Sequence, residues 1–96
     1  MKKSILTEDM EHCYLCGRER EAVHHIYHGT ALRKISDRHG FIVPLCANCH
    51  NMSSTSVHLD KRHVKDTELK KLCQERFEQD HSREEFMKIV GRNYLD

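Results

Sequence analysis

Four of the five cysteines are spaced as two pairs that could hold one metal ion. They form Cys13-x-x-Cys16 and Cys46-x-x-Cys49, with 29 residues between the pairs. In a CxxC turn both thiolates can reach one tetrahedral ion at about 2.3 Å, and two such pairs complete a closed Cys₄ zinc shell. The alternative is chance cysteines or disulfides. No secretory signal is visible, so we expect a cytoplasmic chain with reduced thiols, which favours metal binding.

Histidines cluster between and just after the cysteine pairs. His24 and His25 are adjacent in a segment expected to be a strand, so their side chains point to opposite sides of it. One of them could bind a metal ion while the other faces a substrate. His50 directly follows the second cysteine pair at an expected helix start, where backbone N–H groups and the helix dipole favour anions such as phosphate. His58 follows eight residues later. Together they indicate metal or acid–base chemistry.

The other histidines and the fifth cysteine receive less specific roles. His28 is left open as a substrate or metal contact. His12 could replace a cysteine ligand, although four thiolates leave no vacancy. Ordinary surface or core roles are expected for His39, His63 and His81. Cys73 lies on an apolar helical face and is expected to be a small core residue.

Composition predicts one small domain with a lean core. Of the 96 residues, 38% are hydrophobic, against about 45–50% in typical globular chains. Small domains with so little apolar material often depend on disulfides or a structural metal. Residues 1–11 are expected to form a flexible arm. The domain is expected over residues 12–96, with a zinc-centred ββα core over about 12–58 and a helical part over about 64–95.

Residue patterns predict the elements that must position the cysteines and histidines. Residues 22–27, rich in β-branched and aromatic side chains, predict a short strand. Residues 41–45 predict a second strand, in which Pro44 indicates an edge position or a strand end. The segment 28–40 between them is interpreted as a polar connection. A helix is expected from residue 46 to about residue 53.

Two further helices are expected in the C-terminal part. The first runs over about 66–79, with its apolar face formed at helical spacing by Leu69, Leu72, Cys73 and Phe77. Ser82 and Glu85 form a capping-box pattern at the start of the second, and Gly91 is a natural stop.

Charge is nearly balanced over the whole chain but not along it. Residues 1–65 hold ten Lys and Arg against seven Asp and Glu, whereas residues 66–96 hold six against eight. The first segment is therefore the better candidate for a phosphate-facing surface. No apolar run approaches the about 20 residues of a membrane span. Arg33, Lys34 and Arg38 are candidate phosphate contacts, and a merely solvated loop is the equal alternative.

The combined motifs resemble HNH endonucleases with a structural zinc. The resemblance lies in the first Cys-x-x-Cys, in Val-His-His-Ile, and in Val-Pro-Leu-Cys-x-x-Cys-His. More narrowly, the chain is similar to small HNH-type proteins of bacteriophages and prophages over residues 12–95. That likeness is carried by His24-His25-Ile26-Tyr27-x-Gly29, Arg33-Lys34-x-Ser36, Gly40-Phe41, Leu45-Cys46-x-x-Cys49-His50, Val57-His58 and Gly91-Arg92-Asn93-Tyr94-Leu95. It implies an α+β fold with a zinc-stapled, treble-clef-like ββα-metal unit followed by C-terminal helices.

The resemblance also implies roles for individual residues. His25 matches the general base that acts on water. His24 and His50 match ligands of a catalytic divalent metal, and His58 is an open candidate for a third. The family's middle Asn, which braces the general base, falls by spacing near Phe41, where this chain has none. A backbone carbonyl or another side chain would have to replace it, or the catalytic geometry is weakened.

The activity implied is metal-dependent hydrolysis of DNA phosphodiester bonds, in a bacterial host cell if the chain is phage-encoded. The cofactors implied are a structural Zn²⁺ and a catalytic Mg²⁺, Mn²⁺, Ni²⁺ or Zn²⁺, of which Mg²⁺ is the least natural partner for imidazole. The alternative is a non-catalytic zinc module that binds DNA or a protein, which would not need His25. A redox role for the CxxC pairs lacks the expected βαβ context.

Overall fold

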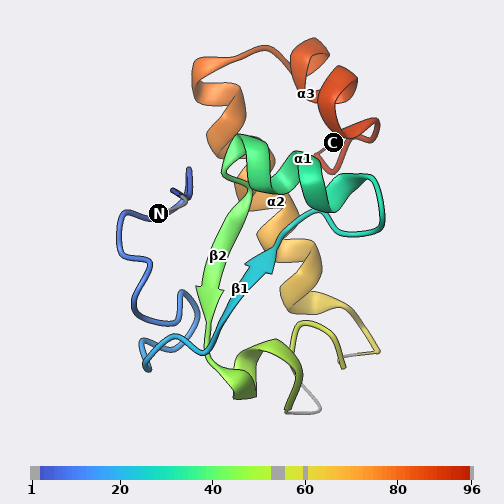
Figure 1. Cartoon of the computed structure of the whole chain (residues 1–96). Coiled ribbons are helices and arrows are strands. Elements are labelled where there is room, and N and C mark those ends of the chain that lie inside the picture. The colour runs from blue at the N-terminus through green and yellow to red at the C-terminus, as the bar shows by residue number, and fades with distance from the viewer. Residues whose placement is uncertain (1–2, 53–55, 60, 96) are drawn as a thin grey trace.

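The computed structural model describes residues 3–52, 56–59 and 61–95 of a small α+β protein (Figure 1). In chain order the elements are β1 (Ala22–His25), α1 (Leu32–His39), β2 (Ile42–Leu45), a short π-helical turn η1 (Asn48–Met52), α2 (Val64–Asp80) and α3 (Arg83–Val90). Within these described residues, no helix is long and apolar enough to cross a membrane.

The two expected strands are present and form a two-stranded antiparallel sheet. His24 lies opposite Val43 and Pro44 lies opposite Val23. Both strands of so small a sheet are edges, so the missing N–H of proline is tolerated there. The Tyr14 N–H donates to the Pro44 carbonyl at 2.8 Å, which attaches the loop of the first cysteine pair to β2.

The segment 28–40, interpreted as a polar connection, instead contains helix α1. Its buried residue is Ser36, whose hydroxyl donates to the Tyr27 carbonyl at 2.6 Å and accepts from the Tyr27 N–H at 3.2 Å. The helix therefore docks by polar bonds to the end of β1, which hydrophobic periodicity does not reveal. Gly40 ends it at φ 76°, and a Cβ there would lie 2.6 Å from the Lys3 carbonyl oxygen.

The N-terminal segment, expected as an arm outside the domain, packs along it from residue 3 onward (Figure 1). The Ile5 N–H donates to the Gly40 carbonyl at 3.0 Å. Ile5 and Leu6 pack against the hydrophobic core, and Met10 is buried. Apolar side chains in a sequence that is polar on average account for this docking.

Helix α2 confirms the expected C-terminal helix but with a different buried face. Leu69, Cys73 and Phe77 are buried as expected, whereas Leu72 is 40% exposed. Gln74 is fully buried in its place. Its amide hydrogen-bonds the segment after α3, so a polar contact buries a residue that hydrophobic periodicity does not place on the packed face.

Helix α3 begins and ends as the sequence predicts. The Glu85 N–H donates to Ser82 Oγ at 3.1 Å, and the Glu85 carboxylate accepts from the Ser82 N–H, which completes the capping box. Gly91 ends the helix in the left-handed region at φ 84°.

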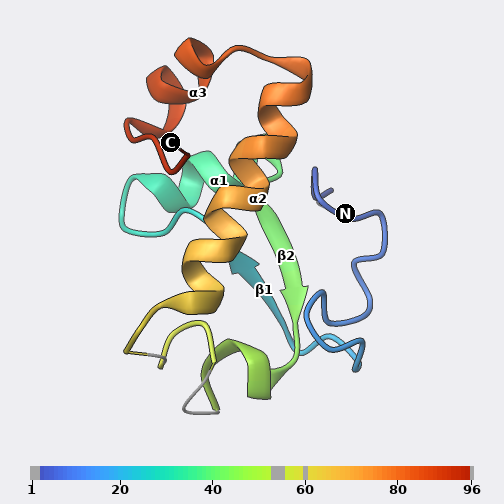
Figure 2. The ribbon, with the colours of Figure 1, turned by 180° about the vertical axis from the view of Figure 1, so that it is seen from behind.

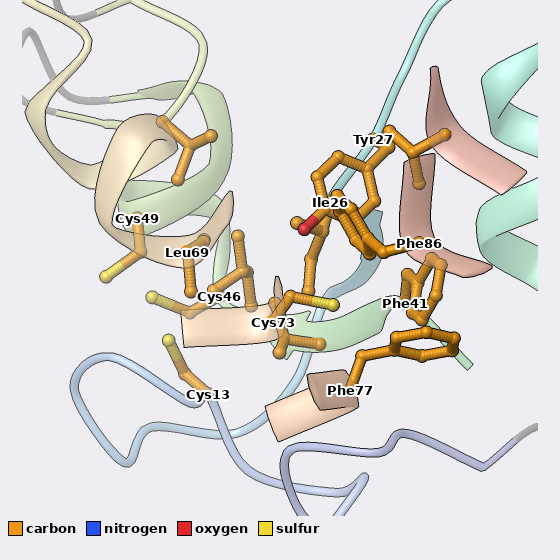
Figure 3. Packing of buried hydrophobic residues seen from close by; sticks show 14 residues of the cluster. Cys13, Ile26, Tyr27, Phe41, Cys46, Cys49, Leu69, Cys73, Phe77 and Phe86 are labelled. Atoms are coloured by element: carbon orange, nitrogen blue, oxygen red, sulfur yellow. The ribbon is translucent and has the colours of Figure 1, made fainter. Parts of the chain in front are cut away.

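The core lies between the sheet and α2, which crosses one face of the strands (Figure 2). Rings from several elements meet edge to face, with Tyr27 and Phe41 centroids 5.4 Å apart and Phe41 and Phe77 centroids 5.7 Å apart. Cys73 lies among them, fully buried as expected, and burial raises the pKa of its thiol to about 12. Figure 3 shows that the core continues from these rings toward the paired cysteines.

Candidate metal centres and active site

The four paired cysteines come together at one end of the core. Their sulfur atoms all lie within 4.8 Å of one another, and the sulfurs of Cys16 and Cys46 are 3.4 Å apart. Four sulfurs around a zinc ion at about 2.3 Å are spaced by roughly 3.8 Å in a tetrahedron. The cluster therefore has the size and donor set of a structural metal site, and Cys13, Cys16, Cys46 and Cys49 can hold the ion.

Local structure accounts for this convergence. Gly17 adopts φ 81° and its N–H donates to the Cys13 carbonyl at 2.9 Å, which closes the first CxxC turn. The second pair follows β2 directly and leads into η1. Figure 3 shows the sulfurs of Cys13, Cys46 and Cys49 directed toward one another, and these three residues are buried.

The thiols perturb one another in a way that a cation would relieve. Burial raises the pKa of Cys13, but backbone N–H donors of Cys46, Cys16 and Leu15 outweigh burial and lower it to about 6. Burial and then the neighbouring sulfurs raise the pKa of Cys49 to about 12. A divalent ion stabilises all four thiolates at once, so metal binding contributes directly to folding.

Three histidines form a second cluster. Ligand nitrogens of His24, His50 and His58 lie within 4.8 Å of one another, and the Nε2 atoms of His50 and His58 are 3.0 Å apart. His24 comes from β1 and His50 from η1. Val57 N–H donates to the Cys49 carbonyl at 2.8 Å and His58 N–H to the His50 carbonyl at 3.1 Å, which turns the chain back to bring His58 alongside.

His24 carries the clearest indication of a ligand. Its Nε2 atom is buried and, among the described residues, has no hydrogen-bond partner. Such an atom costs about 1–3 kcal/mol unless something binds it. Burial, followed by the charges of His58 and His50, lowers the pKa of His24 to about 3. Burial is also the first cause that lowers the pKa values of His50 and His58. The three rings are therefore neutral near pH 7, which is the form that binds a metal ion.

His25 is not one of the three clustered ligands, and its side chain meets Asp37 of α1. Its Nε2 lies 2.8 Å from Oδ1 of Asp37, with the side chains 16% and 32% exposed. The bonds of Ser36 to the end of β1 place Asp37 there. Because a carboxylate only accepts, Nε2 is the protonated nitrogen and Nδ1 carries the free lone pair.

Asp37 is a candidate site residue that the sequence does not indicate. The resemblance places the brace of His25 near Phe41, but Phe41 is fully buried among the core rings. Asp37 is the only carboxylate between Ile26 and Leu45. A lone carboxylate in this part of the sequence is only a weak signal of a role. It becomes informative only when α1 is known to be a helix that packs against the end of β1.

One cavity is lined both by the cluster of His24, His50 and His58 and by His25. It has a volume of about 190 Å³ and is lined by Val23, His24, His25, His28, Arg33, His50 and His58. Of the three expected phosphate contacts, Arg33 lines it, while Lys34 and Arg38 lie exposed on α1 outside that lining. The cavity joins three potential metal ligands, a carboxylate-paired imidazole and one guanidinium.

The remaining histidines separate into one neighbour of the cavity and four others. His28 lines the cavity, and its Nε2 lies 3.3 Å from Oδ1 of Asp66. Its role as a substrate or metal contact stays a prediction. His12 pairs with Asp9 at 2.9 Å. His39 stacks on Phe41 and His81 on Phe77, while His63 occupies the N-cap position of α2 without a side-chain capping bond. None of these four histidines lines the cavity.

The structure thus establishes a small α+β fold with a Cys₄ cluster able to hold a metal ion. No family model, no curated protein and no solved structure matches this chain, so the likeness to HNH endonucleases rests on the sequence motifs alone.

Proposed function

We propose that this chain is a metal-dependent nuclease of the HNH type, which hydrolyses DNA phosphodiester bonds. The observation that carries the proposal is the shared cavity, where the His24, His50 and His58 cluster and the Asp37-paired His25 lie together. A zinc module that only binds DNA or protein needs the cysteines but has no use for a paired imidazole beside a second donor cluster.

His24, His50 and His58 are the residues that would hold the catalytic ion. The orphaned Nε2 of His24 and the neutral state of all three rings fit that role. When bound, such an ion supplies Lewis-acid stabilisation of charge on the phosphate and on the leaving oxygen. Three protein ligands leave coordination positions open, unlike the closed Cys₄ site. A set of imidazoles favours Zn²⁺, Ni²⁺ or Mn²⁺ over Mg²⁺.

His25 acts as the general base in this proposal. Its Nδ1 accepts a proton from the attacking water, while Nε2–H remains bonded to Asp37. As the imidazolium forms, the carboxylate of Asp37 stabilises the new charge and keeps the ring in orientation. Asp37 is thus a positioning residue, and it takes the place of the Asn that the family has on its second strand.

The structural cysteines contribute to catalysis only through position. Cys46 and Cys49 join the end of β2 to η1, and η1 supplies His50. An ion in the Cys₄ site would therefore fix the backbone position of His50, one of the ligands proposed for the catalytic metal. This explains in physical terms why a zinc site and a histidine site adjoin in so small a chain.

A plasmid-nicking assay tests the proposal. Wild type should nick supercoiled DNA with at least one of Mg²⁺, Mn²⁺, Ni²⁺ or Zn²⁺, and His25→Ala should lose about 10²–10⁴-fold in rate, the usual value of general-base catalysis. His81→Ala is the matched control, because His81 is bonded to Glu85 and lies outside the cavity. If wild type nicks DNA with none of the four ions, the non-catalytic zinc module becomes the better account.

A further inference from the structure

A second hollow opens beside the histidine cavity, between α2 and the segment that follows α3. Its volume is about 520 Å³. The residues that give it its chemical character are His28, His63, Asp66, Lys70, Arg92 and Tyr94. In Figure 1 the segment after α3, near the label C, lies on the side of the molecule opposite the N-terminal segment. We call this hollow the C-terminal groove.

Gln74 fixes one wall of the C-terminal groove. Its buried side chain accepts from the Tyr94 N–H at 2.7 Å and donates to Oδ1 of Asn93 at 2.7 Å. The Tyr94 ring also packs against Tyr27, with centroids 5.4 Å apart. The segment after α3 is therefore held against α2 by hydrogen bonds and by the core, and the groove has a defined shape.

Two cations flank one ring in the groove. Lys70 Nζ lies 5.5 Å and Arg92 Cζ lies 5.2 Å from the centroid of Tyr94, both within the range of cation–π attraction. Asp66 is the carboxylate of the groove, and its oxygens are bonded to Lys70 Nζ at 3.0 Å and to His28 Nε2 at 3.3 Å. Arg92 is exposed, whereas Asp66 is buried and paired with Lys70, so the charge that these three residues present to solvent is the guanidinium of Arg92.

His28 lines both the C-terminal groove and the histidine cavity. The two hollows are thus neighbours around one imidazole. Arg33 lines the cavity as well. A polyanion seated over His24, His50 and His58 would therefore meet the guanidinium of Arg33 in the cavity and that of Arg92 in the groove that adjoins it.

We propose that the C-terminal groove binds the phosphate backbone of DNA flanking the scissile bond, with Arg92 as its main phosphate contact. His63 offers a ring nitrogen to the same strand. The occupant is inferred from charge complementarity and from continuity with the cavity, and it rests on the proposed function for the choice of DNA. Phosphate contacts of this kind fix the register of a strand and carry no sequence information, so the contribution is the same for any DNA sequence.

Binding measurements on the full-length chain test this groove. A fluorescently labelled DNA duplex is titrated with protein that carries His25→Ala, to prevent cleavage, and then with the same protein carrying Arg92→Gln, Arg92→Lys or Arg20→Gln. Arg20→Gln is the matched control, since Arg20 is also exposed and lies in the loop before β1. Thermal unfolding of each variant shows whether its fold is retained.

Arg92→Gln should lower affinity and reduce the salt slope of the binding constant by about 0.9, the value of one phosphate contact in duplex DNA. As salt rises from about 50 to 200 mM, the ratio of the parent's DNA-binding constant to that of Arg92→Gln should therefore shrink by about 3.5-fold. Arg92→Lys should retain most of the affinity, and Arg20→Gln should match the parent. Unchanged affinity and slope in a folded Arg92→Gln protein would overturn the proposal, as would an equal loss in Arg20→Gln.

The nicking assay separates this inference from the proposed function. If wild type nicks DNA while Arg92→Gln binds as tightly as its parent, the nuclease stands and the groove proposal falls. If no ion supports nicking while Arg92→Gln lowers affinity and salt slope as described, the groove stands as a DNA-binding surface and the nuclease proposal falls. Binding of free phosphate or of an acidic peptide in preference to DNA would contradict the groove proposal.

Discussion

Replacing Asp37 measures how much the proposed nuclease mechanism depends on the partner of the proposed general base, His25. The bond from His25 Nε2 to Asp37 is 2.8 Å long and partly shielded from solvent. Hydrogen bonds to charged groups contribute about 1.5–3 kcal/mol. Asp37 is one-third exposed, so the lower half of that range applies. At about 1.4 kcal/mol per factor of ten, removing the carboxylate should lower kcat by roughly 10- to 40-fold.

Two substitutions divide that loss between charge and orientation. Asp37→Asn can still accept a hydrogen bond from His25 through its amide oxygen but cannot stabilise the imidazolium by charge. Asp37→Ala removes both contributions and should be the slower of the two. KM for DNA should change little in either variant, because an interaction gained in the transition state acts on kcat.

Steady-state cleavage of a labelled DNA duplex gives kcat and KM separately. Asp80→Asn makes the same chemical change on α2, where the carboxylate is bonded to Arg76 far from the cavity. It should leave both constants unchanged. If Asp37→Ala cleaves with the kcat of wild type, or if only KM rises, then Asp37 does not position His25 and the reasoning from this bond is wrong.

The remaining predictions concern metal, stability and charge. Cys46→Ser should unfold the domain, seen as loss of co-purifying zinc and of cooperative thermal unfolding, because metal binding is folding energy in so small a site; a folded, zinc-free variant would refute this. His24→Ala and His50→Ala should keep that zinc but weaken a second ion in calorimetric titrations, and unchanged affinity in both would remove them from the ligand set. The pKa of His24 in the folded protein lies below its unfolded value of about 6.5. The contribution of His24 to the free energy of unfolding is therefore complete above about pH 6.5 and is lost as the pH falls. From pH 7 to pH 5 that contribution should drop by about 2 kcal/mol. Urea unfolding of wild type and His24→Gln at both pH values should show the smaller drop in the variant, and equal drops would contradict the lowered pKa. Arg33→Gln should raise KM in a salt-dependent way with little effect on kcat; a loss confined to kcat would place Arg33 in the chemistry instead.

The parts of the fold that depend on local spacing are those that the sequence predicts well. The two CxxC pairs, the strands that follow and precede them, and the capping box of Ser82 and Glu85 each depend on residues a few positions apart. Helix α2 follows from hydrophobic periodicity for the same reason. The core role of Cys73 follows from its place on that helix.

The parts that the sequence does not predict depend on polar contacts between distant residues. Helix α1 has few apolar residues, and it is fixed by Ser36 bonded to the backbone of Tyr27. Gln74, not Leu72, is buried because it bonds the segment after α3. Asp37 reaches His25 only because α1 docks where it does. Periodicity and propensity describe apolar faces, so bonds of this kind appear only in the folded structure.

The same limit applies to charge. The C-terminal third of the chain has a net negative charge in sequence, yet its Lys70 and Arg92 gather around Tyr94 beside the histidine cavity. Counting charges along the chain favours Arg33, Lys34 and Arg38 instead. Which face a charge occupies is decided by helix packing, and only Arg33 of those three lines the cavity.

A metal titration with cleavage as its readout tests the central claim most directly. Protein carrying only its structural zinc is supplied with increasing amounts of a second divalent ion, and bound metal and DNA cleavage are measured on the same samples. The account predicts that cleavage rises in proportion to the second ion bound per chain and that His24→Ala removes both the second ion and the activity. Full cleavage by protein that holds a single ion, or no cleavage by protein that holds two, would contradict it.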